Sequence, residues 1–364
     1  MSRIRHSLLL LAPLPIIGLS VTLSAWFRTQ ADEPIVRNDA QFHSPQLHAA
    51  TSQSTPAQSP PSNWELAAEY PAPGRNIERH SPAIKPTRQL AKVKLSPAEI
   101  LLNEKALRQG KLIQTQLGED CQVIVQGPFV IAGDMTQHDL QAWHRDTIAP
   151  AARAMANSYF TVAPSEPIVV LLFKGEESYN GYAKQLYGDE GISVYGYYKP
   201  ARRTLVMNIA TGGGTLVHEL THALMDFDFP KVPDWFNEGL ASLHEQCRFR
   251  ETNQGPSIEG LINWRLPRLQ EAIRDKSLRS LESMMKADDF RGADVSINYA
   301  QARYFCMYLQ ERGLLVDYFR EFRKSQKTDP SGVATAAAVL GDKAWSTIDR
   351  DFQNWVLRLK VAER

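Results

Sequence analysis

Apolar and polar residues recur with distinct periods along the chain, and these periods predict its secondary structure. Ser96-Pro-Ala-Glu99 combines a capping serine, a proline suited to a first helical turn and a glutamate three positions after the serine. It therefore predicts a helix that begins here and runs to about Gly110. Short runs of β-branched and other apolar residues predict strands at 121–126, 129–132, 167–174 and 203–210. Helical spacing of apolar residues predicts helices at 137–159 and 177–187.

The second half of the domain has a different pattern. Gly212-Gly213-Gly214 interrupts the chain, and from Thr215 onward the apolar spacing is almost wholly helical. Strands with a few helices followed by helices alone predict an α+β fold in two lobes. We expect a mixed-sheet lobe, a mainly helical lobe and a cleft between them.

The N-terminal residues have the pattern of an export signal. Arg3, Arg5 and His6 precede residues 7–27, which carry no charged side chain. Such a run is just long enough to span a membrane, and its end only partly meets the small-residue pattern of a cleavage site. A cleaved signal peptide over 1–28 and a retained anchor through 7–27 both remain open. The sequence predicts an exported, extracytoplasmic protein that is membrane-anchored or secreted.

Residues 29–95 separate this signal from the expected domain at 96–364. They are rich in proline, serine, glutamine and alanine and show neither helical nor strand periodicity. Such a segment cannot bury enough apolar surface to offset the entropy of ordering it. It predicts a disordered tether that holds the domain away from a membrane or wall.

Composition narrows the functions further. The 364 residues are 43% hydrophobic, enough for a substantial core, and 41 Lys and Arg residues balance 40 Asp and Glu residues. This balance gives no electrostatic reason to expect a nucleic-acid partner. Cys121, Cys247 and Cys306 are too far apart in sequence to predict a sulfur-ligated zinc site. A disulfide between Cys121 and Cys247 stays open for an exported protein.

One helical segment, 215–225, carries residues suited to metal chemistry. His218 and His222 are four residues apart and so lie on one face, where both imidazoles can bind one ion. Glu219 points about 100° round the helix axis, which suits a general base beside the metal rather than a third ligand. Thr215 is the expected N-cap of this helix.

Glu238 is the expected third ligand. A turn over residues 226–233, with two prolines, brings a second helix that carries Glu238 back beside the first. A catalytic zinc site takes three protein ligands, nitrogen or oxygen, and keeps one position for water. The set His218, His222 and Glu238 predicts one zinc ion per chain, with Glu219 activating the water.

The two motifs resemble those of a known class of enzymes. His218-Glu-Leu-Thr-His-Ala223 is identical to the corresponding stretch of thermolysin-like enzymes. Trp235-Phe-Asn-Glu-Gly-Leu-Ala241 resembles the second motif of zinc aminopeptidases and, more closely, of the peptidase-MA-like group. Over about 120–320 the chain resembles the gluzincin zinc metallopeptidases. The resemblance implies a two-lobed fold and hydrolysis of peptide bonds in a peptide or protein substrate through a metal-bound water, with Glu219 as general base.

The resemblance also implies two features of substrate binding. The strand before the zinc helix, here 203–210, would form the sheet edge along which an extended peptide lies. Tyr299, at the start of the stretch 299–309, resembles the aminopeptidase tyrosine that stabilises the oxyanion of the tetrahedral intermediate. A tyrosine that only packs at a helix start is the alternative for this position.

The chain also departs from the family pattern. Thermolysin-like enzymes place an aspartate four residues after the glutamate ligand to orient a histidine, whereas this chain has Ser242. Asp226, Asp228 and Asn237 are the expected substitutes. The aminopeptidase motif that binds an amino terminus is missing, which favours an endopeptidase or an unusual exopeptidase. A non-catalytic, surface-tethered zinc-binding or assembly module is the competing function, and a Glu219→Gln variant separates the two.

Overall fold

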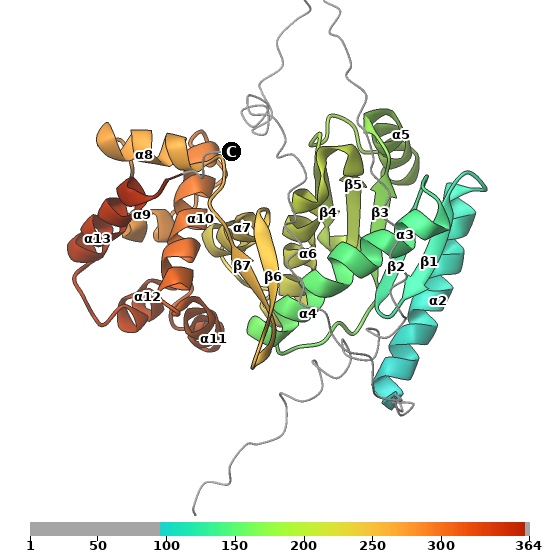
Figure 1. The fold of residues 1–364 in the computed structure, drawn as a ribbon, viewed down its shortest axis with the longest axis horizontal. Coiled ribbons are helices and arrows are strands. Elements are labelled where there is room, and N and C mark those ends of the chain that lie inside the picture. Colours follow the sequence, from blue (N-terminus) through green and yellow to red (C-terminus); the bar gives the residue numbers. More distant parts are fainter. Residues whose placement is uncertain (1–94, 361–364) are drawn as a thin grey trace, which may run out of the picture.

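A mixed five-stranded sheet and a group of helices lie at opposite ends of the molecule in the computed structural model, which describes residues 95–360 (Figure 1). The chain therefore has an α+β fold with a mixed sheet. The expected signal and nearly all of the expected tether lie outside the described residues. Within the described residues no helix is both long and apolar enough to cross a membrane, and the expected anchor at 7–27 is outside them.

The sheet has parallel strands at its centre and antiparallel strands at both edges. Its order is β1-β2-β3-β5-β4, with β2, β3 and β5 parallel. The strands are β1 Gln122–Gln126, β2 Phe129–Gly133, β3 Ile168–Phe173, β4 Gly196–Lys199 and β5 Thr204–Asn208. Four of them match expected strands, whereas β4 was not expected because its four residues are too few to show strand periodicity.

The expected substrate edge at 203–210 is wrong. The β5 strand pairs with β3 on one side and β4 on the other, so it has no open edge. The chain turns back through Pro200–Arg202 and Arg203, which has φ 49°, and this tight reversal places β4 outside β5. The β4 strand is therefore the open edge on that side of the sheet.

Helices cover both faces of the sheet. Helices α2 and α5 pack on one face, and α4 and α6 pack on the other. The bounds are α2 Pro97–Leu117, α3 Gln137–Trp143, α4 Ala149–Ser158, α5 Glu176–Tyr187 and α6 Gly213–Asp228. Because both faces are covered, all six residues of β3 are buried and their side chains alternate between the two cores.

The first helix confirms the expected start and corrects the expected end. Ser96 and Glu99 form the capping box, with the Glu99 N–H 3.3 Å from Ser96 Oγ. The helix continues past Gly110 because that glycine packs closely on β1. A Cβ at this position would lie 2.9 Å from the Val125 side chain. Gly110 thus permits close packing and does not end the helix.

The expected helix at 137–159 is interrupted. Between α3 and α4 lies a π-helical turn, His144–Ile148, in which the Ala149 N–H donates to the carbonyl of His144, five residues back. Pro150, in the first turn of α4, has no N–H to donate and so interrupts regular α-helical bonding.

The chain after α6 is mostly helical, but it contains a hairpin that the sequence pattern did not predict. This hairpin consists of β6 Cys247–Thr252 and β7 Gly255–Gly260 and lies beside α4 and α7. The helices are α7 Asp234–His244, α8 Leu266–Arg274, α9 Leu281–Lys286, α10 Val295–Glu311, α11 Leu315–Ser325, α12 Val333–Val339 and α13 Trp345–Arg358. Figure 1 shows α8 to α13 at the end opposite the sheet, with α7 and the hairpin between.

The three cysteines are unpaired. Cys121 and Cys306 are buried and Cys247 is half-buried, and all three carry free thiols. The disulfide between Cys121 and Cys247 that the sequence left open does not form.

Candidate metal centre

The helix that carries the two histidines begins at a glycine rather than at the expected Thr215. Gly212 is the N-cap with φ 104°, a backbone conformation that favours glycine, and Thr215 lies in the first turn. A Cβ on Gly214 would lie 2.3 Å from the backbone carbonyl oxygen of Glu245. The glycines therefore let the start of α6 approach the end of α7, which brings Glu245 close to this helix.

Helices α6 and α7 bring the three expected ligands together. His218 Nε2 lies 3.0 Å from His222 Nε2 and 3.3 Å from Glu238 Oε2. His222 Nε2 lies 3.5 Å from Glu238 Oε1. Glu238 is only 3% exposed, and both imidazole side chains are about one-tenth exposed. The spacing of four residues and the turn before α7 thus produce one buried cluster, which we call the His-His-Glu cluster.

The geometry of the His-His-Glu cluster fits a small divalent cation. Four ligands at about 2.0–2.2 Å from a tetrahedral zinc ion lie about 3.3–3.6 Å from one another. The separations of 3.0 and 3.3 Å around His218 Nε2 are close to that value. Glu238 Oε2 is buried and has no hydrogen-bond partner within the described residues. A cation bound between these atoms would supply the missing partner.

Charges within the cluster shift the pKa values of its members. Burial lowers the pKa of His218, but the carboxylates of Glu238 and Glu245 outweigh it and raise this pKa to about 10. Burial also opposes ionisation of Glu238, yet His222 and His218 hold its pKa well below the usual range. Within the buried cluster, the carboxylate of Glu238 therefore stabilises a positive charge on His218, and the histidines stabilise the negative charge on Glu238.

Each histidine has a second partner on its other ring nitrogen. His222 Nδ1 lies 2.8 Å from Asn237 Oδ1, and His218 Nδ1 lies 3.1 Å from Glu245 Oε1. Arg265 in turn pairs with Glu245 at 3.2 Å. Such partners fix the orientation of ligand rings.

Asn237 was an expected partner, and Glu245 was not. Glu245 follows Glu238 by seven residues, two helical turns, so it points from α7 in the same direction. Helical spacing was therefore the signal that could have found it. Asp226 lies beside Tyr198 instead, and Asp228 bonds to the segment after α4.

Glu219 and Tyr299 both lie beside the His-His-Glu cluster. Glu219 is 8% exposed, and burial raises the pKa of its carboxyl. Burial and then the charge of Glu238 raise the pKa of the Tyr299 hydroxyl, which also accepts a hydrogen bond from Arg291 Nη1 at 3.2 Å. A carboxyl and a phenol therefore flank the cluster.

Arg291 was not expected. Its Nη2 lies 2.7 Å from Glu238 Oε1, and its Nε lies 3.1 Å from Asp234 Oδ2. Arg291 comes from the segment between α9 and α10, 53 residues after Glu238. No local motif connects positions so far apart in the chain.

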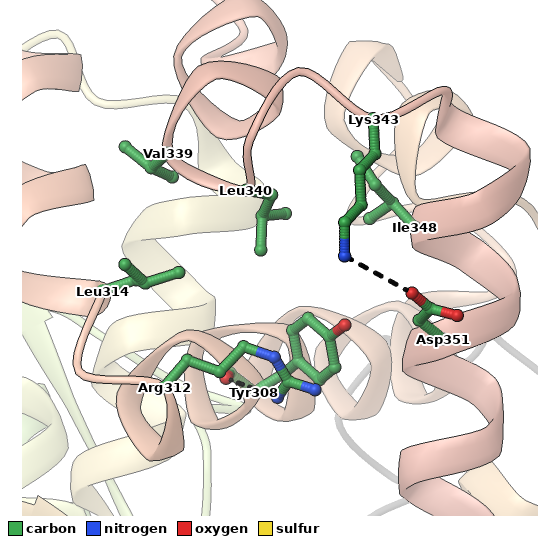
Figure 2. A pocket seen from close by; sticks show the side chains of 8 residues that line it. All are labelled: Tyr308, Arg312, Leu314, Val339, Leu340, Lys343, Ile348 and Asp351. Carbon is green, nitrogen blue, oxygen red and sulfur yellow. Dashed lines mark hydrogen bonds and ion pairs between the residues drawn. The ribbon is translucent and has the colours of Figure 1, made fainter.

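A hollow of about 200 Å³ lies away from the His-His-Glu cluster, among α10, α12 and α13 (Figure 2). Arg312 stacks on Tyr308 in its wall, and Lys343 lies 3.8 Å from Asp351. Its charged groups face partners of their own, and none of its lining residues belongs to the cluster. It gives no alternative centre for the chemistry described above.

The chain matches no model of a known protein family, and no curated protein sequence is significantly similar to it. The class is therefore defined by fold and site alone. This is an α+β protein with a buried His-His-Glu cluster that can hold a metal ion.

Proposed function

We propose that this chain is a zinc-dependent peptidase with a gluzincin-like arrangement of two lobes. The observation that carries the proposal is the convergence of His218, His222 and Glu238 beside the buried carboxyl of Glu219. Two imidazoles and one carboxylate are a ligand set of catalytic zinc, and a carboxyl of raised pKa is suited to general base catalysis.

The chain's own residues divide the chemistry among them. Zinc held by His218, His222 and Glu238 supplies a Lewis acid that polarises the scissile carbonyl and makes water more acidic. Glu219 accepts a proton from the attacking water and transfers it to the leaving amine, so its carboxyl returns to the ionised form. The substrate is thereby divided into a carboxylic acid and an amine.

Tyr299 and the partners of the histidines support this reaction. The Tyr299 hydroxyl donates a hydrogen bond to the oxygen on which negative charge develops. Asn237 and Glu245 hold the two imidazole rings in position through their Nδ1 atoms. The burial of the cluster keeps bulk water away, which strengthens each of these electrostatic interactions.

The open edge of the sheet supplies a place for the substrate backbone. The β4 strand lies against α6, which carries Glu219. The Asn208 N–H donates to the carbonyl of Tyr195, so antiparallel alternation turns the peptide N–H and C=O groups of Gly196 and Tyr198 away from β5. An extended peptide adds to such an edge through backbone hydrogen bonds. We therefore place a peptide or protein substrate along β4.

The export pattern at the N-terminus supports an extracytoplasmic place of action. Under this proposal the peptidase works outside the cytoplasm, either released or held at a membrane by residues 7–27. The Pro- and Ser-rich residues 29–95 then give it reach from its anchor.

The test is to separate metal binding from turnover. We expect one zinc per chain in the wild type and far weaker zinc binding in His222→Ala and Glu238→Ala. Glu219→Gln is expected to keep its zinc and to lose at least about a hundredfold in the rate of peptide-library cleavage, measured by mass spectrometry. Glu104→Gln, an exposed glutamate on α2, is the matched control and should retain full activity.

Two results would contradict the proposal. A folded wild type that binds no zinc would reject the metal site. A wild type that binds zinc but cleaves no peptide would favour the surface-tethered binding or assembly module.

A further inference from the structure

Arg291 connects three side chains around the His-His-Glu cluster. Its guanidinium contacts Glu238 through Nη2, Tyr299 through Nη1 and Asp234 through Nε and Nη2. Asp234 and Glu238 are one turn apart on α7, so the planar guanidinium spans two carboxylates on one helix face. The arginine is thus held in one orientation from two helices, α7 and α10.

The two oxygens of the Glu238 carboxylate have different surroundings. Oε1 lies 2.7 Å from Arg291 Nη2 and 3.5 Å from His222 Nε2. Oε2 is buried without a hydrogen-bond partner among the described residues and lies 3.3 Å from His218 Nε2. A carboxylate can bind a metal through one oxygen or through both. Both oxygens thus face a histidine of the cluster, but only Oε1 is also engaged by a charged donor.

We propose that Arg291 is a positioning residue that makes Glu238 bind the metal through Oε2 alone and so keeps the metal four-coordinate. This inference rests on the proposed zinc site. A guanidinium contact of 2.7 Å is a charge-assisted hydrogen bond, which competes with the ion for Oε1. A single carboxylate oxygen with two imidazoles leaves one tetrahedral position for water or substrate.

The same guanidinium fixes the phenol beside the site. Because Arg291 donates to the oxygen of Tyr299, the phenol proton is directed elsewhere. The Tyr299 hydroxyl also bonds to the Glu238 carboxylate, and in the proposed reaction the substrate oxygen replaces that carboxylate as acceptor. Arg291 therefore links the coordination of the metal to the placement of the oxyanion donor.

A simpler role for Arg291 predicts a different result. As a nearby positive charge alone, it would repel a cation, and its removal would tighten metal binding without altering the coordination number. As a positioning residue, its loss frees Oε1 to bind as well, and the metal becomes five-coordinate.

The experiment is cobalt titration of the full metal-free chain, followed by visible absorption. Four-coordinate cobalt absorbs much more strongly than five-coordinate cobalt, so geometry is read without any activity assay. We expect Arg291→Gln to lower the molar absorption at saturation about threefold or more. Asp234→Asn, which releases the other anchor of the arginine, should give a smaller decrease.

Arg265→Gln is the matched control, since it removes the same group from Glu245 rather than from Glu238. It should weaken cobalt binding yet leave the molar absorption at saturation unchanged.

Equal spectra for wild type and Arg291→Gln would overturn the inference, and so would an equal decrease in Arg265→Gln. A wild type that binds no cobalt would reject the metal site itself. The Arg291 side chain is 51% exposed, so its replacement is not expected to unfold the chain, which circular dichroism checks.

Discussion

Two histidines outside the His-His-Glu cluster are buried in environments that oppose their protonation. Burial and then the charge of Arg153 lower the pKa of His144 to about 4, and burial lowers that of His244 to about 3. The His144 ring packs near Phe129, under the face of the sheet that α4 covers. Both histidines remain neutral in the folded protein well below the pH at which an unfolded chain protonates them.

His144 is expected to make folding sensitive to acid. Above pH 6.5 the imidazole of His144 is neutral in both the folded and the unfolded state. Below pH 6.5 the imidazole becomes protonated in the unfolded state, whereas in the folded state it stays neutral down to about pH 4. Stability is therefore lost as the pH falls through this window, by about 2 to 3 kcal/mol between pH 7 and pH 4.5. Urea unfolding at the two pH values should show a smaller loss for His144→Phe than for the wild type. His138→Phe, at an exposed position, should behave like the wild type.

Helical spacing explains which site residues the sequence could predict. His218, Glu219 and His222 share a helix, so their relative directions follow from its period alone. Glu245 was within reach of the same reasoning on α7. The contact between Arg291 and Glu238 could not be predicted in this way. It depends on how α9 and α10 pack against α7, which no local sequence pattern encodes.

Short edge elements decide where a substrate can lie. The β4 strand has only four residues, yet it changes β5 from an edge strand to an internal one. The expected edge failed for this reason, although the expected strand itself was right. The β6–β7 hairpin shows the same limit. Its alternating half-buried and exposed residues around Asn253-Gln-Gly255 indicate a hairpin, but a longer helical pattern surrounds them.

A proline in β4 tests the proposed substrate edge. Tyr198→Pro removes an N–H that faces the open edge of the sheet. Edge strands tolerate proline at such a position because that N–H makes no bond within the sheet. Loss of one backbone hydrogen bond to substrate costs about 0.5 to 1.5 kcal/mol, so KM should be about two- to twelvefold higher than in Tyr198→Ala. Both variants lack the tyrosine side chain, and the comparison therefore isolates the backbone group. Equal KM values for the two variants would rule out this hydrogen bond.

One buried carboxylate joins distant parts of the whole molecule. Asp228, the last residue of α6, accepts hydrogen bonds at 2.7 Å from the N–H groups of Thr161 and Val162, which follow α4. It also pairs at 2.5 Å with Arg323 of α11. The α+β class follows from the order of elements along the chain. The junction between the sheet side and the C-terminal helices cannot be predicted from that order, because its residues lie far apart in sequence.

Loss of that junction should destabilise the entire fold. Asp228→Ala leaves two backbone N–H groups of the partly exposed segment after α4, and an arginine, without their shared acceptor, at a cost of about 1 to 3 kcal/mol. Guanidinium unfolding would measure the difference. Asp288→Ala, at an exposed position, is the control and should change stability by less than about 0.5 kcal/mol. A similarly small effect for Asp228→Ala would show that the junction does not support the fold.

The free thiols have a practical consequence for following this protein in solution. Burial raises the pKa of all three cysteines, that of Cys247 to about 12, and the thiolate is the reactive form of cysteine. The fold therefore tolerates strong reductants, and its native thiols react slowly with alkylating reagents. A cysteine introduced at Leu112, which is 59% exposed on α2, can then carry a fluorophore or spin label without prior removal of the native ones.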